Sequence, residues 1–216
     1  MRSDWVPLSA SALVTGVMAL VLGTLLNPGT GAESGQQTLH VVSDNSGRWL
    51  AMAVLFFGAS VALTLGLPAV LTLFTRRGHA LGMIGVAVFA VGAIGVSGYA
   101  MLLVFFRALV LKGAVEGANL DEVVSDNGLS IFLFGWIAAF YVGLLLVALA
   151  LLRARRTPVW VPGLILLVVA MMPFGDALGR VGQALQMLAL AVAFTGIAIE
   201  ATSPESRDQL ARDLGR

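Results

Sequence analysis

The sequence predicts an all-α polytopic membrane protein with six transmembrane helices, and three observations lead to this fold class. Of its 216 residues, 58% are hydrophobic and only 12% are charged, whereas about a quarter of the residues of a soluble domain carry a charge. The apolar residues form long blocks, most of them near the roughly 20 residues that a helix needs to cross a bilayer. A five-residue motif recurs ahead of two blocks, which indicates an internal repeat.

Six apolar blocks define the predicted helices in order along the chain. We expect one transmembrane domain, residues 1–203, followed by a short cytoplasmic tail, residues 204–216. The first block is longer than the apolar region of a signal peptide, so we expect it to remain as a helix. The third block is longer than a bilayer requires and the fifth is shorter. The blocks span residues 5–26, 49–74, 80–111, 129–152, 159–172 and 181–199.

The third block also carries five glycines among alanines and valines. Small residues let membrane helices approach each other closely, so this pattern predicts a central, tightly packed helix. A flexible hinge is the alternative interpretation. The five residues are Gly82, Gly85, Gly92, Gly95 and Gly98.

The basic residues predict the orientation. With the N-terminus in the cytoplasm, nine arginines lie on the inner side and four basic residues on the outer side, as the positive-inside rule requires. The predicted topology is therefore N-in and C-in. The bias towards Ala, Val, Gly, Leu and Arg suggests a GC-rich, actinobacterial source, so we expect the protein in the bacterial inner (plasma) membrane.

The recurring motif is VVSDN, at residues 41–45 and 123–127. Each copy precedes an even-numbered predicted helix on the outer side. A third, fainter copy shares only the spacing D-x-x-G-R, which aligns Asp44 with Asp176 and Arg48 with Arg180. The sequence thus predicts three helical hairpins related by a pseudo-repeat, with an aspartate at the outer entrance of each second helix.

Two interpretations of these aspartates remain open. Asp and Asn accept hydrogen bonds from the free N–H groups of a first helical turn, so VVSDN is typical of a helix start. Alternatively, the charged residues converge on an outward-facing polar vestibule that binds a ligand or ion, because ionisable groups at membrane depth are costly and often functional. The members of this predicted vestibule are Asp44, Arg48, Arg107, Asp126, Asp176, Arg180, Gln183 and Gln186.

Catalytic chemistry has little support in the sequence. The chain has no cysteine and two histidines, and Ser97 in a G-x-S-G pattern would need a histidine base that neither His40 nor His79 can supply from its predicted position. No haem ligands, metal-ligand spacing or nucleotide-binding loop is present. We therefore expect no cofactor, no metal, no nucleic-acid partner and no enzymatic activity.

Two stretches carry a resemblance. They are FLFGWIAAFYVGLLLVALALLRARRTPVWVPGLILLVVAMM and, earlier, SGRWLAMAVLFFGASVALTLGL. With them the chain resembles a widespread group of six-helix bacterial integral membrane proteins of unknown function, in which an outer loop leads into an arginine-containing helix start. The resemblance implies a topology but no activity.

These observations predict a non-catalytic binding or accessory protein. Its expected partners are membrane lipid, a membrane-protein partner or a second copy of the chain. The alternative is a transporter or channel for a small solute or ion, with its path entered at Asp176 and Arg180.

Overall fold

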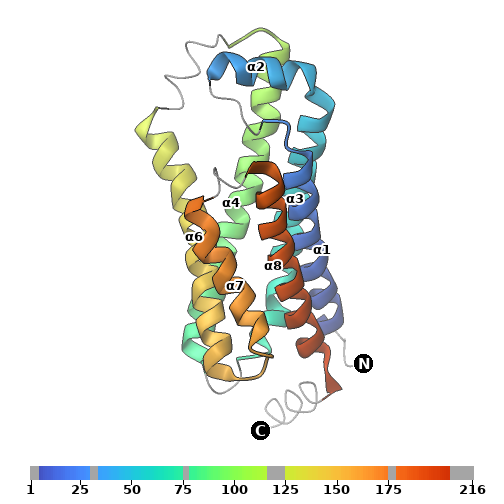
Figure 1. Ribbon diagram of the computed structural model, residues 1–216, viewed down its shortest axis with the longest axis vertical. Helices are drawn as coiled ribbons and strands as arrows, with labels where there is room; N and C mark the ends of the chain where they lie inside the picture. Colours follow the sequence, from blue (N-terminus) through green and yellow to red (C-terminus); the bar gives the residue numbers. More distant parts are fainter. Residues whose placement is uncertain (1–4, 30–33, 75–77, 116–124, 175–178, 205–216) are drawn as a thin grey trace.

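The computed structural model describes residues 5–29, 34–74, 78–115, 125–174 and 179–204, and the regular structure in these ranges is entirely helical (Figure 1). Each of the six predicted blocks coincides with a helix to within a few residues, so the all-α prediction is confirmed. The helices are α1 (Trp5–Leu26), α2 (Gly35–Asp44), α3 (Ser46–Leu71), α4 (His79–Leu111), α6 (Asn127–Ala154), α7 (Trp160–Met171) and α8 (Gly179–Thr202), with a 3-10 turn η1 (Met172–Phe174) after α7.

Five of the described helices are long and apolar enough to cross a membrane, namely α1, α3, α4, α6 and α8. The chain is therefore a helical, membrane-embedded protein. Helix α7 has 12 residues and a length of roughly 18 Å at 1.5 Å per residue, well below the ~30 Å of a bilayer core. Length and hydropathy thus support five of the six predicted spans.

The long helices and α7 form a ring in which each packs against the next, in the order α1, α3, α4, α6, α7 and α8, and α8 returns to α1. The start of α1 and the end of α8 lie at the same end of the bundle (Figure 1). We call the half that contains them the proximal half and the opposite half the distal half. Helix α7 lies mainly in the proximal half (Figure 1).

Glycines bring α4 and α6 close together. A Cβ atom at Gly92 would overlap the backbone of Phe140, and one at Gly143 would overlap the backbone of Phe89. A Cβ atom added at four of the five glycines predicted to pack α4 would overlap a neighbouring residue. One added at Gly98 would meet nothing within 4 Å. The prediction of a tightly packed α4 is therefore confirmed along most of its length.

A hydroxyl group joins α1 to the end of α3. Ser9 Oγ donates to Leu65 O at 2.7 Å and accepts from Ala69 N at 3.1 Å. In a regular helix that carbonyl and that N–H would bond to each other. Pro68, which cannot donate a hydrogen bond, lies inside the same turn, and the hydroxyl of a neighbouring helix satisfies the groups that the irregular turn leaves free.

Helix α2 was not predicted. Ser34 caps its N-terminus by accepting from Gln37 N at 3.3 Å, and Ser with Gln three residues later is the spacing of a capping box. Val42 is fully buried in a small apolar cluster with Trp49 and Leu103. This short amphipathic helix therefore covers the distal ends of α3 and α4.

Candidate functional site

The two VVSDN copies occupy different positions relative to the helices. Asp126 is the N-cap of α6, and its carboxylate accepts from Leu129 N at 2.8 Å, so the helix-start prediction is confirmed for this copy. For Asp44 it is wrong: Asp44 is the last residue of α2, and Ser43 Oγ donates to it at 3.4 Å. Asn45 is the N-cap of α3 and makes no side-chain capping bond. The cause is α2 itself, which occupies the residues that would otherwise lead into α3.

The structure places the other members of the predicted vestibule at different points. Arg48 is exposed in the first turn of α3, and Arg107 is half-buried near the end of α4, where its Nε donates to Ser46 O at 2.8 Å. Asp176 lies outside the described residues, as does the side chain of Arg180. Arg107 thus joins the distal ends of α3 and α4.

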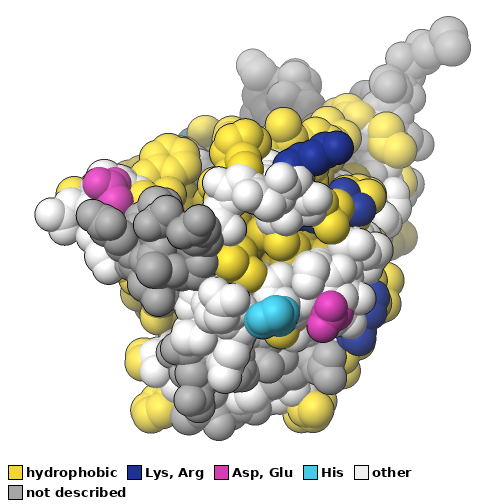
Figure 2. Space-filling model, turned by 90° about the horizontal axis from the view of Figure 1, so that it is seen from above, with side chains coloured by type: hydrophobic (Ala, Val, Ile, Leu, Met, Phe, Trp, Pro, Cys, Tyr) yellow, Lys and Arg dark blue, Asp and Glu magenta, His cyan; other side chains and the backbone are white. Residues whose placement is uncertain are grey.

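Seen from the distal end, the acidic side chains in view lie at two separate places (Figure 2). The predicted polar stripe on α8 also divides. Gln186 is buried and its Nε2 donates to Val168 O of α7 at 2.8 Å, whereas Gln183 lines a pocket. A vestibule that includes Asp176 and Arg180 remains a prediction.

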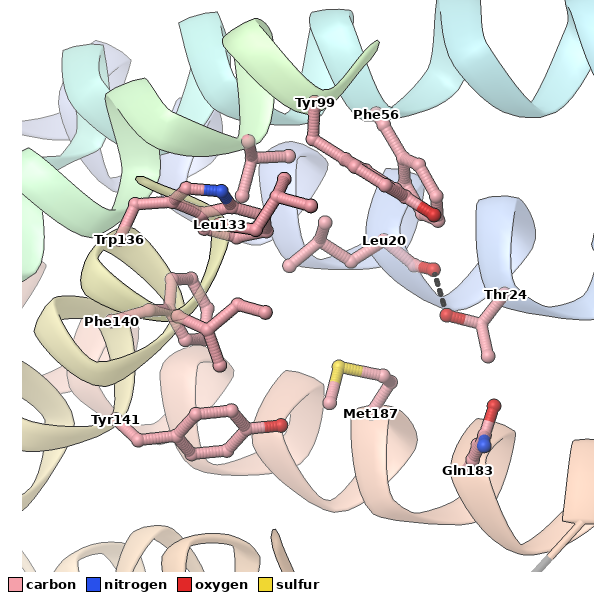
Figure 3. Close-up of a pocket in the computed structure, with 12 residues that line it drawn as sticks. Leu20, Thr24, Phe56, Tyr99, Leu133, Trp136, Phe140, Tyr141, Gln183 and Met187 are labelled. Carbon is pink, nitrogen blue, oxygen red and sulfur yellow. Dashed lines mark hydrogen bonds between the residues drawn. The ribbon is translucent and has the colours of Figure 1, made fainter. Parts of the chain in front are cut away.

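The pocket lined by Gln183 lies in the distal half and has a volume of about 410 Å³. Five helices contribute to its walls, and α7 contributes no residue. Its lining residues are Leu20 and Thr24 of α1, Phe56 of α3, Val96 and Tyr99 of α4, Leu133, Trp136, Ile137, Phe140 and Tyr141 of α6, and Gln183 and Met187 of α8 (Figure 3).

Aromatic rings form much of the wall. Phe56, Tyr99 and Trp136 follow one another across α3, α4 and α6, with ring centroids 6.1 and 5.8 Å apart and planes inclined by 38° and 37°. Phe140 and Tyr141 form a second pair, with centroids 5.6 Å apart and an edge-on arrangement. These separations lie in the favourable range for aromatic pairs, so the rings support one another as a preformed surface.

The polar atoms of the lining are few and uncharged. Figure 3 marks a side-chain hydrogen bond from Thr24 Oγ1 to Leu20 O, at 2.9 Å, and draws none from either tyrosine hydroxyl. Trp136 Nε1 is buried and has no hydrogen-bond partner in the described part of the chain. The pocket therefore combines apolar walls with polar groups available to a ligand.

The position of α7 sets it apart from the helices that line the pocket. Helix α7 packs against both α6 and α8, but it ends below the pocket, to which it contributes no residue. The distal part of α6 presents apolar side chains to the exterior, with Ile131, Phe132 and Phe134 among the most exposed large hydrophobic residues of the chain. Helix α6 packs against α4 and α7, and α8 packs mainly against α1 and α7, so α7 is the element between α6 and α8.

Sequence reasoning did not find this pocket. Trp136 and Phe140 are four residues apart and hence on one face of a helix, but an aromatic stripe is also typical of an ordinary core. The useful signal was the shortness of the fifth apolar block, because a short helix in a ring leaves one side uncovered.

Comparisons with protein-family models, curated proteins and solved structures found no match to this chain. Within the described residues, no group of three or more His, Cys, Asp or Glu side chains is placed to hold a metal ion. The site must accordingly be interpreted from its own geometry.

Proposed function

We propose that this chain is a non-catalytic binding or accessory protein of the bacterial inner membrane, and that it takes an amphiphilic, lipid-like ligand into the pocket between α6 and α8. The observation that supports this proposal best is the pocket itself, with its aromatic walls and its uncharged lining. Its volume, about 410 Å³, falls within the range of small-molecule sites.

The proposed topology has six membrane helices in three hairpins, with both chain ends in the cytoplasm. The packing of α1 with α3, of α4 with α6 and of α7 with α8 supports it. So does the position of the start of α1 and the end of α8 at one end of the bundle (Figure 1). In this orientation the distal half, and with it the pocket, lies at the level of the outer leaflet.

The chemistry of the lining favours an amphiphile over an ion. None of the twelve lining residues carries a formal charge, and an ion without its water requires charged or multiple polar ligands. An apolar chain requires only close contact with side chains, while a polar group on the ligand can bond to the tyrosine hydroxyls. A ligand that already lies in the bilayer can enter from the side.

A transporter or channel entered at Asp176 and Arg180 is the second candidate. One observation favours it: Gln183 follows Arg180 by three residues in α8 and lines the pocket. A path that began at the outer end of α8 would therefore lead into the same pocket.

Native mass spectrometry of the protein, extracted gently from its own membrane, tests the proposal. We expect the chain to carry extra mass that matches a lipid-like molecule. The variant Val96→Trp, which fills the pocket from α4, should lose this mass. The matched control is Val91→Trp, because Val91 lies on the same helix but is 59% exposed on the outer surface.

Two outcomes would contradict the binding proposal. One is a wild-type chain that is isolated repeatedly without bound ligand. The other is a ligand that Val96→Trp retains as fully as Val91→Trp does. Solute flux in liposomes that Asp176→Asn abolishes would favour the transporter instead.

A further inference from the structure

We infer that the ligand of this pocket carries a planar, uncharged ring with carbonyl oxygens and an apolar tail, which is the chemistry of a membrane quinone. This inference rests on the proposed function, since it names the ligand class of the same pocket. The aromatic geometry, the hydrogen-bonding groups and the absence of charge in the lining each support it.

The aromatic walls suit a flat ring. Tyr99 and Trp136 present neighbouring faces from α4 and α6, and Phe140 and Tyr141 line the pocket from the next turn of α6 (Figure 3). Planar π-systems stack on such faces in offset or tilted arrangements, and each pairing adds to the contact made by burial alone. A saturated, flexible chain would gain the burial but not the stacking.

The polar groups suit a ligand that accepts hydrogen bonds. The indole N–H of Trp136 can only donate, and it is buried without an acceptor in the described part of the chain. The hydroxyls of Tyr99 and Tyr141 belong to lining residues on different helices and can also donate (Figure 3). Quinone carbonyl oxygens only accept, so a bound quinone ring would supply what these donors lack.

The lack of charge separates this ligand from an ordinary phospholipid. A phosphate group is recognised by Arg, Lys or clustered N–H groups, and the twelve lining residues include neither Arg nor Lys. A quinone has no charge to neutralise. Its apolar tail could leave the pocket between α6 and α8, past the exposed side chains of Ile131 and Phe134, and remain in the lipid.

Tryptophan fluorescence tests the inference, because quinones quench the emission of a nearby indole. The purified, full-length protein in delipidated detergent micelles would be titrated with decylubiquinone. We expect saturable quenching, most of which is lost in Trp136→Phe and kept in Trp160→Phe. Trp160 is the matched control, since it lies in α7, is about half exposed and does not line the pocket.

A second pair of variants keeps the test independent of the folding of Trp136→Phe. The double substitution Tyr99→Phe with Tyr141→Phe removes both hydroxyls and leaves both rings in place. We expect it to weaken decylubiquinone binding about tenfold, as the loss of two hydrogen bonds would. Val96→Phe, which enlarges a lining side chain without adding an indole, should reduce the saturable quenching further. Excess phosphatidylglycerol should not displace the quinone.

The outcomes distinguish this inference from the proposed function. Linear, unsaturable quenching that Val96→Phe does not change would overturn the quinone assignment. Displacement by phosphatidylglycerol would also overturn it and would indicate a phospholipid site. If native mass spectrometry shows another amphiphile that Val96→Trp removes, the proposed function stands without the quinone. If no bound molecule is found and no quinone binds, both fail.

Discussion

The two halves of α6 differ sharply in their surroundings. In the proximal half Leu144, Val147 and Leu151 are 0%, 4% and 1% exposed, while in the distal half Ile131 and Phe132 are 74% and 67% exposed. Hydrophobicity does not account for the contrast, because both halves consist mainly of large apolar residues. The neighbours contribute to this contrast: α4 and α7 both pack against α6, and α7 lies mainly in the proximal half (Figure 1).

This contrast shows how a pocket can arise in a ring of helices without a specialised loop. Five long helices and one short one form the ring, and the short one lies mainly in the proximal half (Figure 1). The proximal half can then be packed for stability while the distal half keeps space for a ligand. We expect substitutions in the proximal half to affect stability and those around the pocket to affect binding.

The largest expected effect on stability comes from Gly143→Leu in the proximal half. The new side chain would overlap the backbone of Phe89 and force α4 away from α6, so we expect a loss of about 3 kcal/mol or more in the free energy of unfolding. Gly135→Leu is the control, because Gly135 lies on the same helix and a Cβ atom added there would meet nothing within 4 Å. Unfolding in mixed micelles measures both, and equal stability of the two variants would contradict the comparison.

A smaller effect is expected from Ser9→Ala, also in the proximal half. The change leaves Leu65 O and Ala69 N without the hydroxyl that now joins them to α1, and we expect it to cost about 1–3 kcal/mol. Ser11→Ala is the matched control, because the Ser11 hydroxyl is exposed and bonds only to Leu8 O of its own helix. A loss as large in the control as in Ser9→Ala would show that the bond to α3 contributes little.

The smallest effect should come from the two aspartates of the repeated motif. Asp126→Ala removes the N-cap bond to Leu129 N and should destabilise α6 by about 1 kcal/mol. Asp44→Ala removes no cap, since Asp44 ends α2, and should leave stability unchanged. The two variants can be compared by the same unfolding measurement. Equal losses would mean that both copies act alike, as the sequence repeat predicts.

Hydropathy was sufficient to predict the six apolar helices, because a membrane requires its helices to be apolar. It placed α1 at its observed bounds and α3, α4, α6, α7 and α8 within a few residues, but it missed α2. The glycines of α4 were also predictable, since their spacing is a direct sign of close helix packing. Both signals are local to one helix.

The features that were not predicted depend on more than one helix. VVSDN is the same sequence in both copies, yet one copy ends α2 and the other leads into α6, because the two copies hold different places in the fold. The spacing of Ser34 and Gln37 is that of a capping box, which is a local signal for the start of α2. The pocket depends on which helices flank the short α7, and a single sequence does not give that arrangement.

The hydroxyl that joins α1 to α3 has a consequence for the order of assembly. Without Ser9, the last turn of α3 would present Leu65 O and Ala69 N to hydrocarbon with a proline between them, and lipid offers such groups no partner. Helix α1 precedes α3 in synthesis, so its serine is already in the membrane when α3 arrives. The first hairpin can therefore complete its hydrogen bonds as soon as it has two helices, before any later part of the ring exists.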